Sequence, residues 1–575
     1  MTAHTVTNRR TAADTMMALG GRGAQTYPPS WKIGQMHRLG ARFLHEHQRC
    51  DTHGSRQPNR CCAGATVLWS RNDSLRSPAC PCAPSPNAAG GTVQSSSADN
   101  ARLSAAHWPA GAYRREHLPE RVLQFGTGML LRALCAASVD AANAAGVFSG
   151  RVVVIQSTPQ GHARAINAQD GLFTLVERGR EHGAPVERTR LVGAISRALV
   201  ADTEWPAVRD VVARPELQVI VSNVTEAGFR LDATYPARLT DLLYTRFARL
   251  PDGPPVFVIP TELVDDNGRH LAAMVDRLAD DLERGVEFRD WLRARVRFCA
   301  SLADRITTGT PSRGVRLALE RRLGYADALL TVTEPHSLWA IEADPAALRT
   351  AFAIDVLPES VIIAPDIGFY RERKLRLLNG AHTATAPLAL LAGVRTVREA
   401  AEHPRLGAFL RHILFDEIVP ATDLPGEAAV AFAETVIDRF RNPWLDHEWR
   451  VIAANQTAKL RARVVPSLAG FARKRGIAPQ GLALGLAAYL RWVRSRPAGD
   501  ADLPLIERHW RTATAPQGLA ASALADADLW GLSLAGLPGL LEATTRWLVL
   551  LERDGVDAAL DALPGMPQHA ATGRT

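Results

Sequence analysis

The chain has no long hydrophobic run. No apolar stretch approaches the roughly 18 residues that a membrane-spanning helix requires. The richest stretches, Gly481–Leu490 and Trp547–Leu551, are short and have arginines nearby. Residues 1–25 also lack the apolar segment that follows the arginines of a signal peptide, so we expect a cytoplasmic protein with no membrane partner.

Cysteine is scarce in most of the chain. Five of the seven cysteines lie within residues 1–100, and only Cys135 and Cys299 follow. Without a secretory signal, a disulfide framework is not expected in a chain of 575 residues. Neither Cys61-Cys62 nor Cys80-Pro81-Cys82 has the spacing of a zinc ribbon, so no metal site is expected. A zinc-dependent alcohol dehydrogenase is disfavoured, because the two later cysteines belong to no cluster of ligands.

Excess positive charge is largely confined to the N-terminal region. Residues 1–100 carry eleven Lys or Arg and five Asp or Glu, which accounts for +6 of the formal net charge of +8. The rest of the chain is nearly neutral, so nucleic acid is not the expected partner. Residues 1–103 are rich in Ser, Pro, Gly, Asn and Arg and lack sustained periodicity. They are expected to form a disordered leader, or to result from a start codon assigned too far upstream.

Lysine is nearly absent. Only four of the 67 Lys and Arg residues are lysines, at positions 32, 374, 459 and 474. Arginine keeps its proton at every usable pH, whereas a partly desolvated lysine can release it. Lys374 stands five residues before Asn379 and eight before His382. It is therefore a candidate for proton transfer, and a surface lysine on a helix is the alternative interpretation.

A strand, a glycine turn and a helix open the ordered part of the chain. Arg121–Phe125 is a short apolar strand, Gly126-Thr127-Gly128 forms the turn, and Met129–Ala144 has a helical pattern. This is the first unit of a dinucleotide-binding fold, in which glycines let the backbone approach the pyrophosphate at the helix N-terminus. Leu131 stands where the full fingerprint has its third glycine, so the signal alone is weak.

The remaining pattern predicts two domains. Residues 104–360 are expected to form a Rossmann-type α/β domain with a mainly parallel sheet, and residues 361–575 an all-helical domain. The second strand ends at Gln156-Ser157-Thr158 without a ribose-binding acid, so the choice between NAD and NADP is not made there. Further strands of the first domain are expected at Arg151–Gln156, Leu172–Glu177, Val219–Val224 and Val256–Val264. Helices are expected between them at Trp205–Ala213 and Ala237–Leu250.

The stretch Lys374–Thr383 begins the first long helix of the second domain. At 100° per residue, Lys374, His382 and Asn379 fall at about 0°, 80° and 140°, on one broad face. A neutral lysine accepts an alcohol proton, an asparagine donates to a developing alkoxide, and a histidine orients the hydroxyl. A partly buried helix start with a satisfied histidine is the structural alternative, and spacing alone does not decide between them.

Together these features resemble the polyol-specific long-chain dehydrogenases, the mannitol dehydrogenase family. The resemblance covers about Leu118–Leu563. Within the family the chain is similar to the tagaturonate reductase branch, on the basis of Thr225–Gly228 and Asn379–Thr383, although Met129-Leu130 replaces the Asn-Phe usual there. The segments that carry the resemblance are Val122–Gly128, Ser222–Gly228, Glu262–Gly268, Asp304–Ile306, Lys374–Thr383, Arg439–Pro443, His447 and Lys459.

The resemblance implies zinc-independent hydride transfer with NAD and a lysine general acid/base. It places that role on Lys374, an oxyanion role on Asn379 and substrate orientation on His382. A second oxyanion asparagine is expected in a strand-end cluster, where Asn267 is the candidate, and Lys459 is expected to contact the substrate and to face its carboxylate. The cofactor loop carries over as Val122, Leu123, Gln124, Phe125, Gly126, Thr127, Gly128, Met129, Leu130, Leu131, Arg132 and Ala133.

The implied partner is a small hexuronate or aldonate, and the implied reaction interconverts D-tagaturonate and D-altronate. Fructuronate reductase and mannitol dehydrogenase activities are alternatives within the family. A nucleotide-binding protein without catalysis, whose basic leader contacts nucleic acid, is the alternative from another class. The sequence does not predict the oligomeric state.

Overall fold

The computed structural model describes residues 101–566, except 226–227, 358–359 and 496–499. The expectation for residues 1–103 thus lies almost entirely outside the described residues. At the beginning of the described chain, Arg102 forms a β-bridge with Ala326, and Leu103 is fully buried. None of the described helices is long and apolar enough to cross a membrane.

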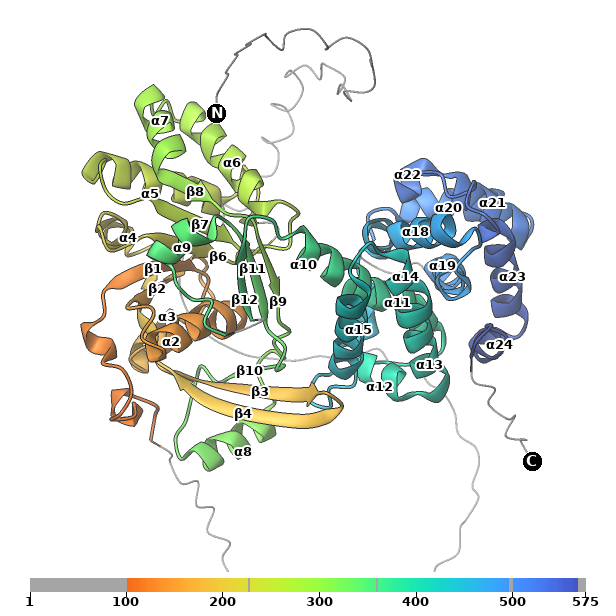
Figure 1. Cartoon of the computed structure of the whole chain (residues 1–575), viewed down its shortest axis with the longest axis horizontal. Helices are drawn as coiled ribbons and strands as arrows, with labels where there is room; N and C mark the ends of the chain where they lie inside the picture. Colours follow the sequence, from red (N-terminus) through yellow and green to blue (C-terminus); the bar gives the residue numbers. More distant parts are fainter. Residues whose placement is uncertain (1–100, 226–227, 358–359, 496–499, 567–575) are drawn as a thin grey trace, which may run out of the picture. The chain divides into compact units, whose positions relative to one another are not determined.

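A six-stranded parallel sheet forms the centre of the N-terminal domain (Figure 1). Because helices cover both faces, the strands are continuous apolar runs, and Val152–Ile155 is buried throughout. The prediction of a mainly parallel sheet is confirmed. Its two edge strands were not predicted, because Ser196 and Arg197 interrupt the apolar run of β5 and because β8 has only three residues. In spatial order the strands are β5 (Ile195–Val200), β2 (Arg151–Gln156), β1 (Glu120–Phe125), β6 (Val219–Ser222), β7 (Val256–Pro260) and β8 (Val296–Phe298).

Alternate residues of β1 point into two hydrophobic cores. Leu123 and Phe125 belong to one core with α4 (Trp205–Val212), α5 (Thr234–Arg249), α6 (Asn267–Asp281) and α7 (Val286–Arg295). Val122 belongs to the other core, on the opposite face. That core contains α3 (Ala163–Ala168) and the continuous helical run α1 (Met129–Leu131), a π-helical turn (Arg132–Ala136) and α2 (Ala137–Ala144).

Two small sheets complete this domain. One has the order β10-β3-β4 and the other β12-β11-β9. The predicted strand Leu172–Glu177 lies in β3 of the first small sheet rather than in the central sheet, because it pairs with β4 as an antiparallel hairpin. The bounds are β3 (Phe173–Glu181), β4 (Ala184–Val192), β9 (Ser301–Asp304), β10 (Thr331–Thr333), β11 (Leu338–Glu342) and β12 (Val361–Ala364), with α8 (Arg313–Leu323) and α9 (Pro345–Ala351).

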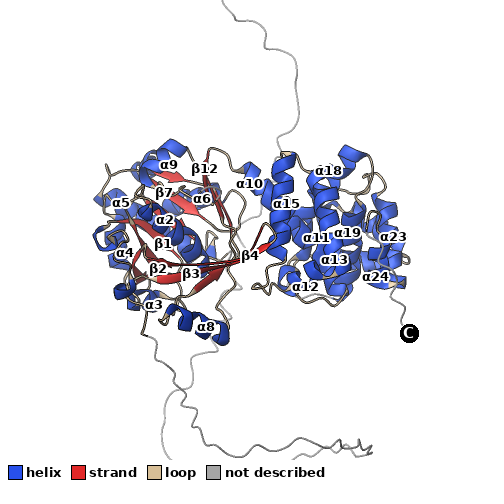
Figure 2. Ribbon diagram, turned by 60° about the horizontal axis from the view of Figure 1, so that its bottom comes forward, coloured by secondary structure: helices blue, strands red, loops and turns tan. Residues whose placement is uncertain are grey.

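The described residues after β12 form helices only (Figure 2). Three of the segments are π-helical: Lys374–Gly380, Ile413–Ile418 and Leu460–Val464. The α-helices are α10 (Gly368–Arg373), α11 (Ala381–Leu391), α12 (Val397–Glu402), α13 (Pro404–His412), α14 (Val419–Ala421), α15 (Gly426–Phe440), α16 (Trp449–Ile452), α17 (Gln456–Lys459), α18 (Val465–Arg475), α19 (Gln480–Trp492), α20 (Leu503–Thr512), α21 (Pro516–Ala525), α22 (Ala527–Trp530), α23 (Leu540–Arg553) and α24 (Gly555–Asp561), and Val493–Ser495 is a 3₁₀ turn.

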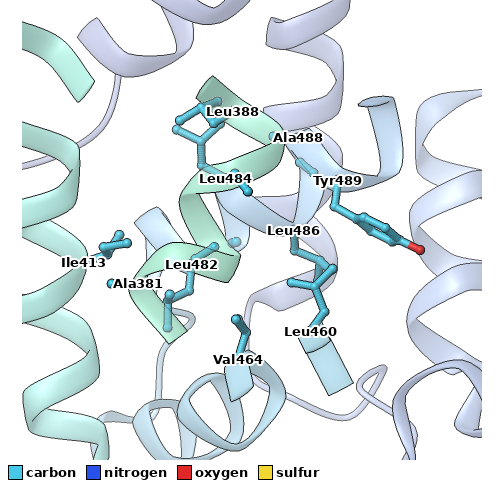
Figure 3. Packing of buried hydrophobic residues seen from close by; sticks show 14 of the residues in the cluster. Ala381, Leu388, Ile413, Leu460, Val464, Leu482, Leu484, Leu486, Ala488 and Tyr489 are labelled. Carbon is cyan, nitrogen blue, oxygen red and sulfur yellow. The ribbon is translucent and has the colours of Figure 1, made fainter. Parts of the chain in front are cut away.

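The core of the helical domain is built around α11 and α19. Leucines of α19 pack with Ala381 and Leu388 of α11 (Figure 3). Gly485 brings the two helices together, since a Cβ there would lie 2.7 Å from the carbonyl oxygen of Ala384. This packing fixes the backbone of α11, which begins one residue before His382.

The β3–β4 hairpin contacts the helical domain. The amide of Gly183, in its turn, donates a 2.9 Å hydrogen bond to Asp438 of α15. Nδ2 of Asn442, just after α15, donates to the carbonyl oxygen of Arg178 at 3.0 Å. Segments distant in the sequence thus hold α15 against the α/β domain.

Candidate active site

A pocket of about 460 Å³ lies where the carboxyl ends of β6 and β7 meet the helical domain. Ligands of open α/β sheets bind outside the carboxyl ends of the strands. Residues from both domains line it: Leu130, Asn223, Val224, Glu262, Leu263, Ala303, Asp304, Arg305, Ile306, Lys374, Leu378, Asn379, His382, His447, Val451, Ile452, Lys459 and Arg463. The pocket therefore brings together Lys374, Asn379, His382 and Lys459, which the sequence had singled out.

The helix predicted to begin at Lys374 does form, but its first seven residues do not have the α-helical geometry that was expected. Residues Lys374–Gly380 form a π-helix, and α-helical geometry begins only at Ala381. In a π-helix the backbone hydrogen bonds join residues five apart, and such segments are frequent at functional sites. Lys374 and Asn379 are five residues apart and both reach the pocket. The 100° wheel therefore describes the relative positions of these two side chains incorrectly, although it grouped them on one face.

Lys374 lines the pocket and is buried. Only 8% of its surface is exposed, and Nζ donates a 2.6 Å hydrogen bond to the carbonyl oxygen of Ala303. Burial lowers the pKa of Lys374; the nearby carboxylate of Asp304 opposes that shift, and Arg439 and Arg463 add to it. A lysine in this environment exchanges its proton at a lower pH than a solvated lysine.

Asp304 is held by a buried arginine from the helical domain. Both Nη atoms of Arg439 donate to the Asp304 carboxylate, at 3.0 and 2.8 Å, and Nε and Nη2 donate to Glu334 at 2.9 and 2.8 Å. Burial alone would raise the pKa of Asp304, but the charges of Arg439 and Lys374 hold it well below its ordinary value. Asp304 therefore stays ionised and supplies a fixed negative charge beside Lys374.

His382 and Asn379 occupy the same pocket with different surroundings. The His382 ring packs against Phe440, with centroids 4.2 Å apart, and lies 5.6 Å from the ring of His447. Burial and the neighbouring His447 keep the pKa of His382 well below its ordinary value, so the ring is neutral. Asn379 is half-buried, and its side-chain amide makes no hydrogen bond to another described residue. It is available to a ligand.

Asn267 does not line this pocket. It is the first residue of α6 and is 1% exposed. Its Nδ2 donates to the carbonyl oxygens of Pro260, Glu262 and Ser301 at 3.2, 2.9 and 3.0 Å, and its Oδ1 accepts from the amide of Ser301 at 2.9 Å. The structure thus engages the whole carboxamide in backbone contacts, contrary to the oxyanion role expected for it.

Asn223 and Glu262 stand in the pocket instead, at the ends of β6 and β7. Nδ2 of Asn223 donates to Oγ1 of Thr261 at 3.0 Å. The carboxylate of Glu262 accepts from the amide of Val224 and from Ser222, and burial raises its pKa. Both residues belong to segments that carry the family resemblance, Ser222–Gly228 and Glu262–Gly268, but the sequence does not show which polar side chain of each segment faces the pocket.

Lys459 also lines the pocket and is the last residue of α17. Its Nζ donates a 2.7 Å hydrogen bond to the carbonyl oxygen of Ile452, and its charge lowers the pKa of the His447 ring. The π-helix Leu460–Val464 follows and places Arg463 in the pocket as well. Sequence reasoning did not single out Arg463; its spacing of four residues from Lys459 is the signal that was available.

The glycine turn after β1 fits a dinucleotide. Gly126 has a φ of +124°, and a Cβ there would lie 3.1 Å from the carbonyl oxygen of Asn223. Gly128 has open space where a Cβ would stand, at the start of the helical run from Met129, so a phosphate can approach the backbone amides. Leu131, in place of a third glycine, is buried beneath the turn.

Only part of the predicted cofactor loop reaches the surface. The side chains of Val122, Leu123, Gln124 and Phe125 are fully buried in β1, so they cannot touch a cofactor. Arg132 is 2% exposed and bonds to Thr331 and to the carbonyl oxygen of Thr127; burial lowers its pKa to about 10. Leu131 and Ala133 are also buried. The accessible part is Gly126–Leu130.

The end of β2 carries no carboxylate among its own residues. Gln156 bonds to the loop that follows it, through the carbonyl oxygen of Thr158 at 3.0 Å. Arg238 of α5 donates to the carbonyl oxygen of Ser157 and forms an ion pair with Asp202, which follows the neighbouring strand β5. Among the described residues, no group of three or more His, Cys, Asp or Glu side chains is placed to hold a metal ion.

Comparison with known families agrees with this fold. Residues 120–353 match the mannitol dehydrogenase Rossmann domain, and residues 366–549 match the mannitol dehydrogenase C-terminal domain. The chain belongs to the mannitol dehydrogenase family. This confirms the predicted class, a nicotinamide dinucleotide-dependent oxidoreductase that acts on CH–OH groups.

Among named relatives, the chain is similar to altronate oxidoreductases. It is 37% identical over 471 residues to the altronate oxidoreductase of Klebsiella pneumoniae, an alignment that covers 77% of this chain and 97% of the relative. The altronate oxidoreductase of Cronobacter sakazakii is 34% identical over 471 residues, with the same coverage.

Two solved structures share the fold. Mannitol 2-dehydrogenase of Pseudomonas fluorescens, in a ternary complex with NAD and D-mannitol, aligns with a TM-score of 0.59 and 23% identity, covering 80% of this chain and 96% of that chain. A D-sorbitol dehydrogenase in substrate-free form aligns with a TM-score of 0.67 and 20% identity, covering 80% of this chain and all of the other.

Proposed function

We propose that this protein interconverts D-tagaturonate and D-altronate with NAD, using Lys374 as general acid and base. The observation that carries the proposal is a buried lysine with a lowered pKa, placed in one pocket with Asn379 and His382. The substrate assignment is supported by relatives named altronate oxidoreductase.

The glycine turn Gly126–Gly128 would hold the dinucleotide, which when bound would donate hydride in its reduced form, NADH, and accept hydride in its oxidised form. In the reducing direction the ammonium of Lys374 gives its proton to the keto oxygen. In the oxidising direction neutral Nζ takes the proton from the hydroxyl. The hydrogen bond from Nζ to the carbonyl oxygen of Ala303 fixes the position of Nζ in both directions of the reaction.

Asn379 and His382 complete the arrangement around the reacting oxygen. The amide of Asn379 has donors free to stabilise negative charge on that oxygen. The neutral ring of His382 orients the hydroxyl, because a neutral imidazole can both donate and accept. Lys459, which also lines the pocket, contacts the substrate and adds positive charge there.

One assay panel tests the proposal. NADH and NADPH are offered to the purified protein with D-tagaturonate, D-fructuronate and D-fructose, and oxidation of the coenzyme is followed by absorbance. We expect the highest kcat/KM with NADH and D-tagaturonate. Equal or faster turnover of D-fructuronate or D-fructose would show that the substrate assignment is wrong. A preference for NADPH would show that the assignment of NAD as cofactor is wrong.

A further inference from the structure

Arg463 is an arginine of the pocket with most of its donors unused. Within residues 101–566, apart from the gaps at 226–227, 358–359 and 496–499, its guanidinium makes one hydrogen bond, a long contact of 3.4 Å from Nη1 to Oγ1 of Thr383. Among the described residues, no carboxylate lies within ion-pair distance of its guanidinium. A guanidinium carries five N–H donors. Taking such a group out of water without a counter-ion costs free energy, which an anionic ligand would recover.

The other charged groups of the pocket are already engaged. Arg305 pairs with Glu177, and Asp304 pairs with Arg439. Glu262 accepts its hydrogen bonds from Ser222 and from the amide of Val224. The pocket therefore has no carboxylate of its own to offer Arg463.

The backbone of Arg463 is held in place from the catalytic segment. Nη1 of Arg376, inside the π-helix Lys374–Gly380, donates to the carbonyl oxygens of Ala462 and Arg463 at 2.7 and 3.0 Å. Gly380 lies against the same carbonyl, since a Cβ there would be 3.4 Å from the oxygen of Arg463. These contacts fix the base of the Arg463 side chain relative to Lys374 and Asn379.

We infer that Arg463 binds the carboxylate of the substrate and so makes the enzyme select a sugar acid over the corresponding neutral sugar. The planar guanidinium matches a carboxylate with two parallel hydrogen bonds, which a lysine cannot provide. Lys459, four residues earlier, supplies a second positive charge to the same pocket. The inference rests on the proposed function, and it names the residue that would set the substrate class.

The proximity of Arg463 to the reacting groups fits this role. Its positive charge lowers the pKa of both Lys374 and His382. A substrate that reaches Lys374 with its keto oxygen thus has Arg463 within the same pocket for its charged end.

The test compares wild type, Arg463→Gln and Arg463→Lys. D-Tagaturonate is assayed beside D-tagatose, in which a CH₂OH group replaces the carboxylate, and D-fructuronate beside D-fructose. For the acids we expect Arg463→Gln to lower kcat/KM by about 10²-fold, the worth of a hydrogen-bonded charge pair, mainly by raising KM. The neutral sugars should change by much less. Arg463→Lys should fall between, because it keeps the charge but loses the paired geometry.

Arg473→Gln is the matched control, because Arg473 is an exposed arginine of α18 outside the pocket. Its kinetics should equal those of wild type. An equal loss on acid and neutral sugar, or a loss confined to kcat, would overturn the inference. If Arg463→Gln does not fold, the KM of Arg463→Lys for the acids decides the question, and an unchanged KM overturns the inference.

Failure of the proposed function has a different signature. A wild-type enzyme that prefers D-fructuronate contradicts the proposed substrate, yet the fructuronate–fructose pair still tests Arg463. A wild-type enzyme that turns over neutral sugars but neither acid overturns both proposals.

Discussion

Nζ of Lys374 lies 4.0 Å from Oδ1 of Asp304, and both carboxylate oxygens of Asp304 are bonded to Arg439. The lysine comes from the first π-helix of the helical domain, and the aspartate from the end of β9. The candidate proton donor of the helical domain therefore lies beside a carboxylate of the α/β domain that Arg439 holds in place.

Replacing Lys374 should remove proton transfer. Lys374→Ala is expected to lower kcat by at least about 10²-fold, the usual worth of a general acid/base. Lys374→Arg should be impaired as well, because an arginine does not release its proton. The kcat of NADH oxidation with D-tagaturonate measures both. Lys474→Ala is the control, since Lys474 is 40% exposed and pairs with Asp423 outside the pocket. Near wild-type kcat in Lys374→Ala would reject the role.

The rate of alcohol oxidation should rise with pH earlier than a solvated lysine would allow. Oxidation needs neutral Lys374, and burial lowers its pKa, so the rising limb lies below the ordinary lysine value of about 10.4. Reduction needs the ammonium and should fall through the same pH range. Because the charge of Arg463 also lowers this pKa, Arg463→Gln should move the limb to higher pH. A limb that stays in place, measured as log kcat against pH, contradicts this coupling.

Removing Arg439 should destabilise the fold. Arg439→Met leaves Asp304 and Glu334 buried without their cation, and losing one member of such a group typically costs about 3–5 kcal/mol. Urea unfolding followed by circular dichroism measures the loss. Arg411→Met is the comparison, because Arg411 and Glu434 form an exposed pair, which is worth less than about 1 kcal/mol. Equal effects of the two substitutions would contradict this account.

The same network predicts acid sensitivity. The folded state holds the pKa of Asp304 below its ordinary value. Its stabilising contribution is therefore fully present above the unfolded carboxyl pKa of about 3.9 and is lost as pH falls through the lower folded value. Wild type should lose stability on acidification over that range, and Asp304→Asn should lose less. A steeper loss in the variant would show that the sign is wrong.

Two asparagines should separate structure from catalysis. Asn267→Ala leaves buried backbone groups without partners and should cost on the order of 2–4 kcal/mol of unfolding free energy, with kcat of the folded enzyme nearly unchanged. Asn223→Ala should lower kcat or raise KM with a smaller effect on stability, since Asn223 lines the pocket. The reverse pattern would restore the oxyanion role first assigned to Asn267.

Two glycines of the cofactor turn should fail differently when replaced by alanine. Gly126→Ala is expected to destabilise the fold, because its φ of +124° and the carbonyl oxygen of Asn223 leave no room for a side chain. Gly128→Ala should fold normally, since its φ is −69° and nothing lies within 4 Å. It should weaken NADH binding, measured by fluorescence titration, if the pyrophosphate passes over it. Unchanged NADH affinity in Gly128→Ala would place the cofactor elsewhere.

Much of the fold was predictable because buried parallel strands and amphipathic helices leave strong patterns. The unit Arg121–Ala144 and the helical character of the second domain follow from apolar runs, glycines and periodicity. Leu172–Glu177 was placed in the wrong sheet, because strand periodicity does not reveal the partner. The pairing with β4 depends on the tertiary structure, and β4 itself is mostly exposed.

The site was predictable in residue type and less so in geometry. Lys374, Asn379, His382 and Lys459 do share one pocket. Asn267 and Asn223 both follow apolar strands, and only the backbone course decides that one bonds the chain and the other faces the ligand. Arg463 was missed because its one mark in the sequence, a spacing of four residues from Lys459, is weak in a chain with so many arginines. Its distinguishing property is that no carboxylate of the described part of the chain pairs with its guanidinium.

The ion cluster that joins the domains also sets an order of events during synthesis. Arg439 follows Asp304 by 135 residues and Glu334 by 105. When the α/β part leaves the ribosome, its two buried acids have no cation, so it cannot complete its interior until α15 has been made. The N-terminal part should therefore remain an open, chaperone-dependent intermediate while the helical part is translated. Produced alone, it would lack the arginine that pairs with both of its buried acids.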